Sequence, residues 1–203
     1  MSNKLLSAKV QKPVDVRLDG RIETLFDTLA VLQGDSRLSF FQNGQPRNPA
    51  ERNYTQNPLP GDEIRKVLGV KVDTAIFAIK TAANIDPVKI LNGLKKGSVE
   101  ITVDSNSNKV VWVPITEFLD FDGAQITTGQ TAADEYDIIV TIPSTGFRRL
   151  DDPFQIGVQQ VFEVLVHFAN AADFPTAAHW TTAGQMPLEL RVELQVSKED
   201  PKK

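Results

Sequence analysis

The residues that could carry chemistry are few and lie far apart in the chain. There are two histidines, His167 and His179, and no cysteine. A histidine-based zinc site needs more ligands at suitable spacing than these two. Without cysteine there can be no disulfide, thiolate metal site or cysteine nucleophile. His167 also falls on the polar side of an expected strand, which indicates a solvated or interfacial histidine. We therefore expect no metal and no cofactor.

Two acidic segments and the known short motifs add no catalytic site. Residues 104–108, Asp-Ser-Asn-Ser-Asn, begin like a calcium-binding loop, but Lys109 stands where that loop needs glycine and Ile115 where it needs glutamate. A turn between two strands explains the composition better. Asp151 and Asp152 are adjacent, so their side chains should point apart. The chain also lacks a phosphate-binding glycine loop, a GxSxG motif and an HExxH motif. We expect neither catalytic residues nor a small-molecule substrate, and predict that the protein is not an enzyme.

The composition is that of a globular domain. The chain has 203 residues, of which 41% are hydrophobic and 24% charged, and its net charge is −4. This length suits one domain with a sizeable core. The acidic balance argues against a basic surface for nucleic acid. No apolar run approaches the ~18 residues of a membrane-spanning helix, and the first nine residues lack the apolar core of a cleavable signal. We therefore expect a soluble protein that is made inside the cell.

Hydrophobic spacing predicts a helix near the N-terminus. Apolar residues recur there at steps of three and four, which places them on one face of an amphipathic helix. They are Ile22, Leu25, Phe26, Leu29 and Leu32. We assign residues 1–35 to an N-terminal arm that carries this helix. Its apolar face either packs on its own domain or docks on a neighbouring subunit, and in the second case Leu25, Phe26 and Leu29 make the contact.

From about residue 36 the hydrophobic period changes to two, which indicates strands. The expected strands cover residues 36–42, 63–79, 98–104, 109–115, 123–128, 135–142, 158–168 and 187–196. Asp86 and Pro87 should begin a short helix before the third of them. Regular alternation of apolar and polar residues is typical of an antiparallel sheet that covers a core. We assign residues 36–197 to the main domain and residues 198–203 to a flexible tail.

The predicted fold class is all-β, a single eight-stranded antiparallel jelly roll. It would be a sandwich of two sheets with the N-terminal helix and the short helix before the third strand. An immunoglobulin-like sandwich is the alternative, but it prefers shorter connections and lacks such helices. The connections at residues 42–62, 116–134 and 169–186 are long, and long loops usually make contacts. The core residues that we expect are Phe40, Leu68, Val70, Phe162, Val164, Leu190 and Val192.

Three segments of the chain resemble the jelly-roll capsid proteins of tailless, icosahedral, lipid-containing bacteriophages. The first is Leu-Ser-Phe-Phe at 38–41 with Arg-Asn-Tyr-Thr-Gln-Asn-Pro-Leu-Pro at 52–60. The second is Ile-Leu-Asn-Gly at 90–93, the strand at 99–103, and Val-Pro-Ile-Thr-Glu-Phe at 113–118. The third is Leu-Asp-Asp-Pro-Phe-Gln-Ile at 150–156, which leads into Val-Phe-Glu-Val at 161–164. Many coat proteins of this family carry two jelly rolls, whereas this chain is long enough for one.

The resemblance implies a structural virion protein. It would be a capsid subunit that assembles an icosahedral shell, as the major coat protein or as a penton or other minor component. Its partners would be copies of itself and other capsid proteins, in a virion made in the host cytoplasm. Contact with an internal membrane or with the genome stays open. Besides the helix face, the candidate subunit contacts are the loop residues Asn53, Tyr54, Arg148 and Trp180.

Two other functions that use a jelly roll stay open as alternatives. A carbohydrate- or receptor-binding module needs an exposed aromatic platform or a calcium site, and the chain has only two Trp and two Tyr. An enzyme of the cupin type needs two or three clustered histidines. The particle size of the purified protein would separate a shell protein from both.

Overall fold

The computed structural model describes residues 22–42, 48–54, 57–58, 64–74, 77–80, 86–104, 108–132, 135–157, 159–176 and 187–199. Strands predominate within them, so the expected all-β class is confirmed. The strands are β1 (Ile22–Ala30), β2 (Arg37–Phe40), β3 (Ile64–Thr74), β4 (Phe77–Lys80), β5 (Ser98–Val103), β6 (Asn108–Pro114), β7 (Gln125–Ala132), β8 (Glu135–Thr141), β9 (Arg148–Ile156), β10 (Phe162–His167) and β11 (Glu189–Glu199). The helices are α1 (Pro87–Lys95) and the short 3-10 helix η2 (Ile115–Glu117).

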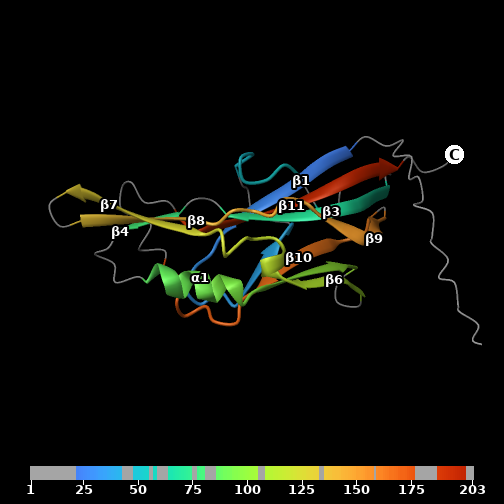
Figure 1. Ribbon diagram of the computed structural model, residues 1–203. Coiled ribbons are helices and arrows are strands. Elements are labelled where there is room, and N and C mark those ends of the chain that lie inside the picture. The colour runs from blue at the N-terminus through green and yellow to red at the C-terminus, as the bar shows by residue number, and fades with distance from the viewer. Residues whose placement is uncertain are drawn as a thin grey trace, which may run out of the picture.

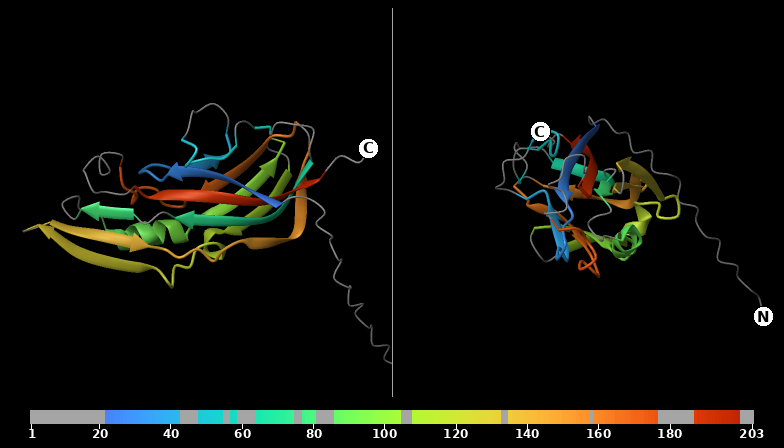
Figure 2. Two further views of the ribbon diagram at one scale, coloured as in Figure 1. Left: turned by 90° about the horizontal axis from the view of Figure 1, so that it is seen from above. Right: turned by 90° about the vertical axis from the view of Figure 1, so that its left-hand side faces the viewer.

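The strands form three antiparallel sheets. The first sheet has the order β1-β11-β3-β9, the second β2-β10-β5-β6, and the third β4-β8-β7. The first and second sheets lie one above the other as the two layers of a sandwich, and the third sheet extends from one end of it with α1 below (Figure 1). The view from above shows the same elongated arrangement (Figure 2, left). The antiparallel sandwich that the strand pattern predicts is therefore present.

The core lies between the two four-stranded sheets, and six of the seven predicted core residues are buried in it. These six are Phe40, Val70, Phe162, Val164, Leu190 and Val192. They come from β2, β3, β10 and β11, so both layers contribute to one hydrophobic cluster. Each lies on the apolar side of its strand, as the period of two requires.

The seventh predicted core residue, Leu68, is only half-buried because β3 contains a β-bulge. Val67 and Gly69 pair with consecutive residues of β11, so Leu68 is an extra residue in its strand. The alternation of side chains therefore shifts, with Val67 buried before the bulge and Val70 after it. Glycine suits position 69 because a Cβ there would lie 3.0 Å from the carbonyl oxygen of Arg148 on β9. The assignment of Leu68 to the core is wrong for this reason.

The segment predicted as the N-terminal helix is strand β1, so that prediction is wrong. All nine of its residues pair with β11 at the edge of the first sheet. Leu25 and Leu29 lie opposite Leu194 and Leu190. A spacing of four fits one face of a helix and one face of a strand equally well, and the pairing with β11 decides between them. Residues 1–21 of the predicted arm lie outside the described residues.

The strand boundaries differ from the prediction in three further places. The strand expected at 63–79 is two strands, β3 and β4, and those expected at 123–128 and 135–142 are β7 and β8 of the third sheet.

Strand β9 occupies a segment for which the sequence predicts a loop, because Asp151, Asp152 and Pro153 interrupt the alternation. Proline is tolerated there since β9 is an edge strand that pairs with β3 alone. The predicted tail begins too early, because Lys198 and Glu199 belong to β11, while residues 200–203 lie outside the described residues.

The short helix expected before the third strand is α1. The carboxylate of Asp86 caps it by accepting a hydrogen bond from the Val88 backbone N–H at 2.9 Å, and a proline occupies the first turn. The helix ends at Lys95, and Lys96 is its C-cap. Gly97 then leads directly into β5. The end of α1 therefore presents two consecutive lysines beside the first residue of β5.

Candidate functional site

The predicted subunit-contact residues from β1 and the long loop are largely used inside the domain. Leu25 and Tyr54 are each only 6% exposed. Leu29 is partly buried against the core. Phe26 lies on the outer face of the first sheet beneath the guanidinium of an arginine on β11. Trp180 lies outside the described residues.

The other two candidates, Asn53 and Arg148, keep surface that another subunit could contact. The Asn53 side chain binds the edge of β1, because its Oδ1 accepts from the Phe26 N–H at 2.7 Å and its amide group donates to the Thr24 carbonyl. Arg148 forms an ion pair with Glu117 of η2. Asn53 is exposed, and about a third of the Arg148 side chain is exposed. These two therefore remain candidates for a contact between subunits.

A buried carboxylate ties the long loop to the first sheet. Asp27 is fully buried on the core side of β1. Its Oδ2 accepts hydrogen bonds from the Phe41 N–H at 2.7 Å and from the Tyr54 hydroxyl at 3.1 Å. Arg52 forms a β-bridge with Asp27, and its guanidinium lies 4.7 Å from the centre of the Tyr54 ring. Since a buried polar side chain is costly unless it is hydrogen-bonded, this cluster holds the described part of the loop in one position.

A second loop residue, Asn57, joins the ends of two strands. Its side-chain amide donates to the carbonyl oxygens of Phe41 and Phe162, and its Oδ1 accepts from the Phe162 N–H at 3.3 Å. Phe41 follows β2 and Phe162 begins β10, so one side chain continues the ladder between these strands. The described part of the long loop makes its contacts within its own chain.

The outer face of the second sheet brings an acid and a histidine together. Glu100 on β5 is buried, and its Oε2 lies 3.1 Å from Nε2 of His167 on β10. His167 therefore has a carboxylate partner, where the strand pattern indicates only a solvated or interfacial position. Across the sheet, Glu100 lies opposite Trp112 on β6, and Ser98 lies opposite Pro114. These side chains share the face that points away from the core.

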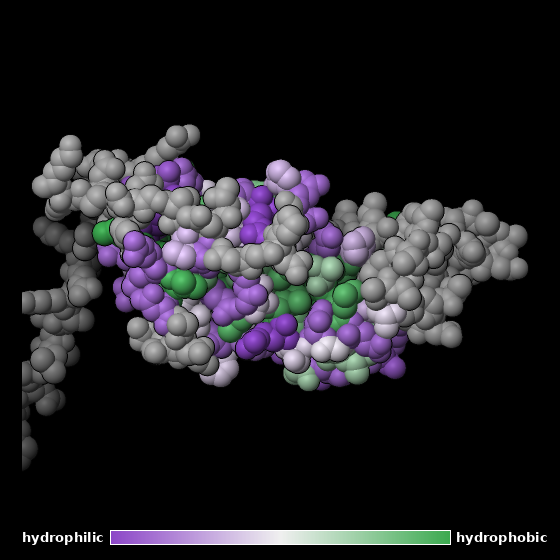
Figure 3. Space-filling model, turned by 180° about the vertical axis from the view of Figure 1, so that it is seen from behind, coloured by the Kyte–Doolittle hydropathy of each residue, from purple (hydrophilic) through white to green (hydrophobic). Residues whose placement is uncertain are grey.

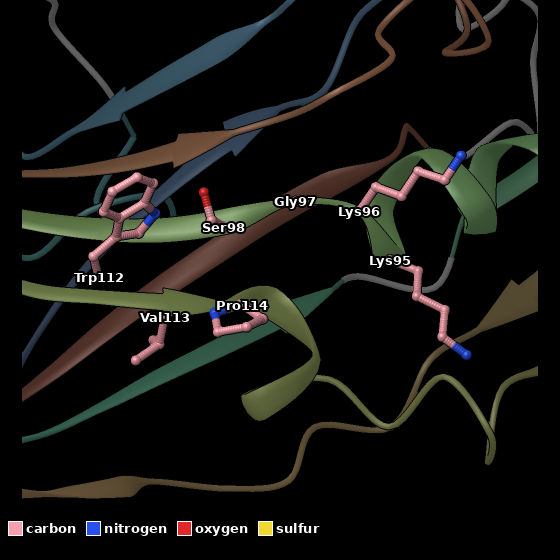
Figure 4. A pocket seen from close by; sticks show the side chains of 7 residues that line it. All are labelled: Lys95, Lys96, Gly97, Ser98, Trp112, Val113 and Pro114. Carbon is pink, nitrogen blue, oxygen red and sulfur yellow. The ribbon is translucent and has the colours of Figure 1, made fainter.

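A hollow of about 420 Å³ opens beside Trp112 on this outer face. It is lined by residues 95–98, where α1 runs into β5, and by residues 112–114 of β6. Trp112 is 66% exposed. In Figure 4 its ring and the Ser98 side chain project to the same side of the strands, Lys96 extends at the far end, and Lys95 points away from them. Nζ of Lys95 lies 3.6 Å from a carboxylate oxygen of Asp122. An aromatic ring and a cationic end thus border the hollow.

A second hollow, of about 300 Å³, lies on the outer face of the first sheet. Glu51 from the loop lines it together with Asp73, Glu189 and Arg191 from the strands. Burial raises the pKa of Glu189, and the Glu51 carboxylate raises it further. Asp73 and Arg191 both have ion-pair partners on the same sheet face. The hollow is therefore acidic, with its cation already paired.

Trp112 is not among the predicted site residues, although the sequence contains a usable signal for it. Val111 and Val113 flank Trp112, and both pack against the core. In an amphipathic strand the residue between two core-facing residues points to the other side. A tryptophan at such a position indicates an exposed aromatic surface. The lysines at the end of α1 could not be associated with it, because only the fold places α1 beside β6.

Within the described residues there is no group of three or more histidine, cysteine, aspartate or glutamate side chains that could hold a metal ion. The helices of the described part of the chain include none that is long and apolar enough to cross a membrane. Comparisons with models of known protein families, with curated proteins and with solved structures return no match.

Proposed function

We propose that the two four-stranded sheets form a jelly roll and that the protein is a structural subunit of an icosahedral virion shell. The observation that carries the proposal is the pairing of the strands. β1 pairs with β11, β2 with β10, β3 with β9, and β5 with β6. If only the eight strands of the first and second sheets are counted, the first strand pairs with the last and the second with the next to last. The third and fourth then pair with the sixth and fifth.

This ladder is rolled into two layers. β11 also pairs with β3, and β10 also pairs with β5, so successive rungs alternate between the first and the second sheet. Eight strands wound in this way form a jelly roll, an architecture used by viral capsid proteins, lectin domains and cupins. The remaining strands occupy connections, with β4 between β3 and β5, and β7 and β8 between β6 and β9. The eight strands predicted from the sequence include residues 123–128 and 135–142, which belong to the third sheet. The eight strands of the two larger sheets include β1 and β9 instead.

The segments that carry the resemblance to capsid proteins fall at defined places in this ladder. Residues 38–41 cover β2 and its end, residues 99–103 lie in β5, and residues 113–118 join β6 to η2. Residues 150–156 form most of β9. Because fold alone does not establish function, these segments and the ladder together support the choice of a shell subunit among jelly-roll proteins.

The surface combines hydrophilic residues with a few exposed hydrophobic side chains that could contact other subunits. On the face in Figure 3, hydrophilic residues surround a narrow hydrophobic strip. Exposed large hydrophobic side chains come from separate segments, among them Ile126 on β7 and Ile139 on β8. Both lie on the sheet that extends beyond the sandwich (Figure 1). Contacts with other copies and other capsid proteins would use this extension together with Asn53 and Arg148.

The test is the particle size of the purified full chain, measured by light scattering and by negative-stain microscopy. We expect closed shells or symmetric rings. Ile126→Asp together with Ile139→Asp should reduce assembly while leaving the circular dichroism spectrum unchanged. Val161→Asp, at an exposed hydrophobic residue that lies outside the extension and is not adjacent in sequence to Asn53 or Arg148, is the matched control and should still assemble. A protein that stays monomeric at all concentrations would contradict the proposal.

A further inference from the structure

The hollow beside Trp112 has the features of a small ligand site that the shell function does not use. Its volume of about 420 Å³ lies within the range of ~300–1,000 Å³ that is usual for small-molecule sites. We propose that it binds a saccharide that carries a carboxylate group, with the sugar ring on the indole of Trp112 and the carboxylate at Lys96. The proposal does not depend on the shell function, because every residue of the hollow comes from one chain.

The aromatic part of the site has a fixed backbone and an exposed ring. Trp112 lies in the β5–β6 ladder, between residues that pair with Val99 and Ile101 in the core. Its backbone is therefore fixed, while its ring is 66% exposed. An exposed aromatic ring held by a sheet offers a flat apolar surface with little entropy left to lose on binding. The apolar C–H face of a sugar ring is a complementary surface.

The cationic part of the site selects the charge of the ligand. Lys95 is within reach of Asp122 at 3.6 Å, whereas Lys96 forms no ion pair with any residue in the described part of the chain. The carboxylate of Glu100, opposite Trp112, is buried and lies against His167, and it does not line the hollow. The open side of the hollow is therefore positive although the whole chain has a net charge of −4.

The Ser98 side chain offers a partner for a sugar hydroxyl group. Figure 4 places Ser98 between Trp112 and Lys96, with its hydroxyl on the same side as the indole. A ring stacked on the indole would thus meet a hydroxyl that both donates and accepts hydrogen bonds. A nucleic acid strand would need a row of cations for successive phosphates, whereas this hollow offers one unpaired lysine. One charge, one stacking surface and one hydroxyl fit a single acidic sugar unit.

The experiment compares glucuronate with glucose, which has the same ring without the carboxylate. Binding to the full chain is followed by NMR through the backbone amide signals of residues 96–98, which every variant keeps, and in chains with Trp112 also through its indole N–H signal. We expect glucuronate to bind at least about fivefold more tightly than glucose at low salt, and this preference to shrink at high salt. Trp112→Ala should abolish binding of both sugars, and Trp112→Phe should weaken it. Lys96→Gln should weaken glucuronate binding about fivefold and leave glucose unchanged.

Two matched variants and one further ligand complete the test. Lys89→Gln removes another exposed lysine of α1, and Phe147→Ala another exposed aromatic ring, and both should bind like the parent chain. Equal affinity for glucose and glucuronate, or unchanged binding in Trp112→Ala, would overturn the proposal. So would AMP binding at least tenfold more tightly with the same response to the variants, which would identify a nucleotide site. The assembly state is measured separately, so failure to form shells leaves this result unaffected.

Discussion

Replacing Asp27 by alanine should destabilise the fold more than any comparable change at an exposed aspartate. The substitution removes the acceptor of the buried Phe41 N–H, whereas the Tyr54 hydroxyl keeps the Gln42 carbonyl oxygen as an acceptor. An unsatisfied buried donor costs about 1–3 kcal/mol, and the lost hydrogen bond from Tyr54 about 0.5–1.5 kcal/mol. The free energy of unfolding should therefore fall by about 1.5–4.5 kcal/mol, a large part of the ~5–15 kcal/mol that a domain usually has. The unfolding free energy is measured by urea denaturation at pH 7, followed by circular dichroism.

A second variant tests whether the network acts as a unit. Tyr54→Phe removes one donor and leaves Asp27 with the Phe41 N–H, so it should cost less, about 0.5–1.5 kcal/mol, the usual net contribution of one hydrogen bond. The double variant Asp27→Ala, Tyr54→Phe should cost less than the sum of the two single changes, because both remove the same hydrogen bond.

The matched control is Asp151→Ala on the outer edge of the first sheet. Asp151 is exposed, so the unfolding free energy should change by no more than about 0.5 kcal/mol. A cost of under about 1 kcal/mol for Asp27→Ala would contradict this prediction. Strict additivity in the double variant would also contradict it, since the two side chains would then not share an interaction.

Two further predictions use melting temperature. Burial raises the pKa of Glu189. Above the ordinary glutamate pKa of about 4.3, the folded chain therefore binds more protons than the unfolded chain. The free energy of unfolding then falls as the pH rises through the pKa of the folded chain. Glu189→Gln should raise the melting temperature at pH 7 but have little effect below about pH 4, whereas Glu193→Gln, which breaks an ion pair, should lower it at pH 7. Gly93→Ala would stabilise an exposed helix by about 1 kcal/mol; here it should lower the melting temperature, because the new Cβ would lie 2.9 Å from Cε1 of Phe174.

Segments with an unbroken local pattern were predictable. In β11, Leu190 and Val192 alternate with polar residues and are buried as expected. The helix α1 follows from Asp86 and Pro87, since a side-chain cap and a first-turn proline act within a few residues. In both cases neighbouring residues alone determine the conformation.

The misread segments depend on contacts between residues far apart in the chain. The apolar residues of β1 fit a helix until residues about 165 positions later supply β11 as a partner. No local pattern reveals the bulge at Leu68, because the register on both sides of β3 creates it. The polar residues of β9 suggest a loop, and only its place at the edge of the sheet makes a strand with proline acceptable.

The residues of the candidate site also divide into those that the local sequence indicates and those that only long-range contacts bring together. Composition and motifs alone led to the expectation of no catalytic or metal chemistry. Trp112 on the outer face of β6 could be inferred from the valines on either side of it. Its neighbours could not, because Lys96 and Ser98 reach it only through the packing of α1 and β5 beside β6.

The sequence by itself therefore determined the all-β class, most strands, the short helix and most of the core, because hydrophobic periodicity and capping act over a few residues. The tertiary structure alone decided that residues 22–30 form a strand, that a bulge turns Leu68 away from the core, and that Asp27 is buried. It also decided that Trp112 and Lys96 border one hollow. These features depend on long-range pairing and on exclusion of water, which local sequence does not encode.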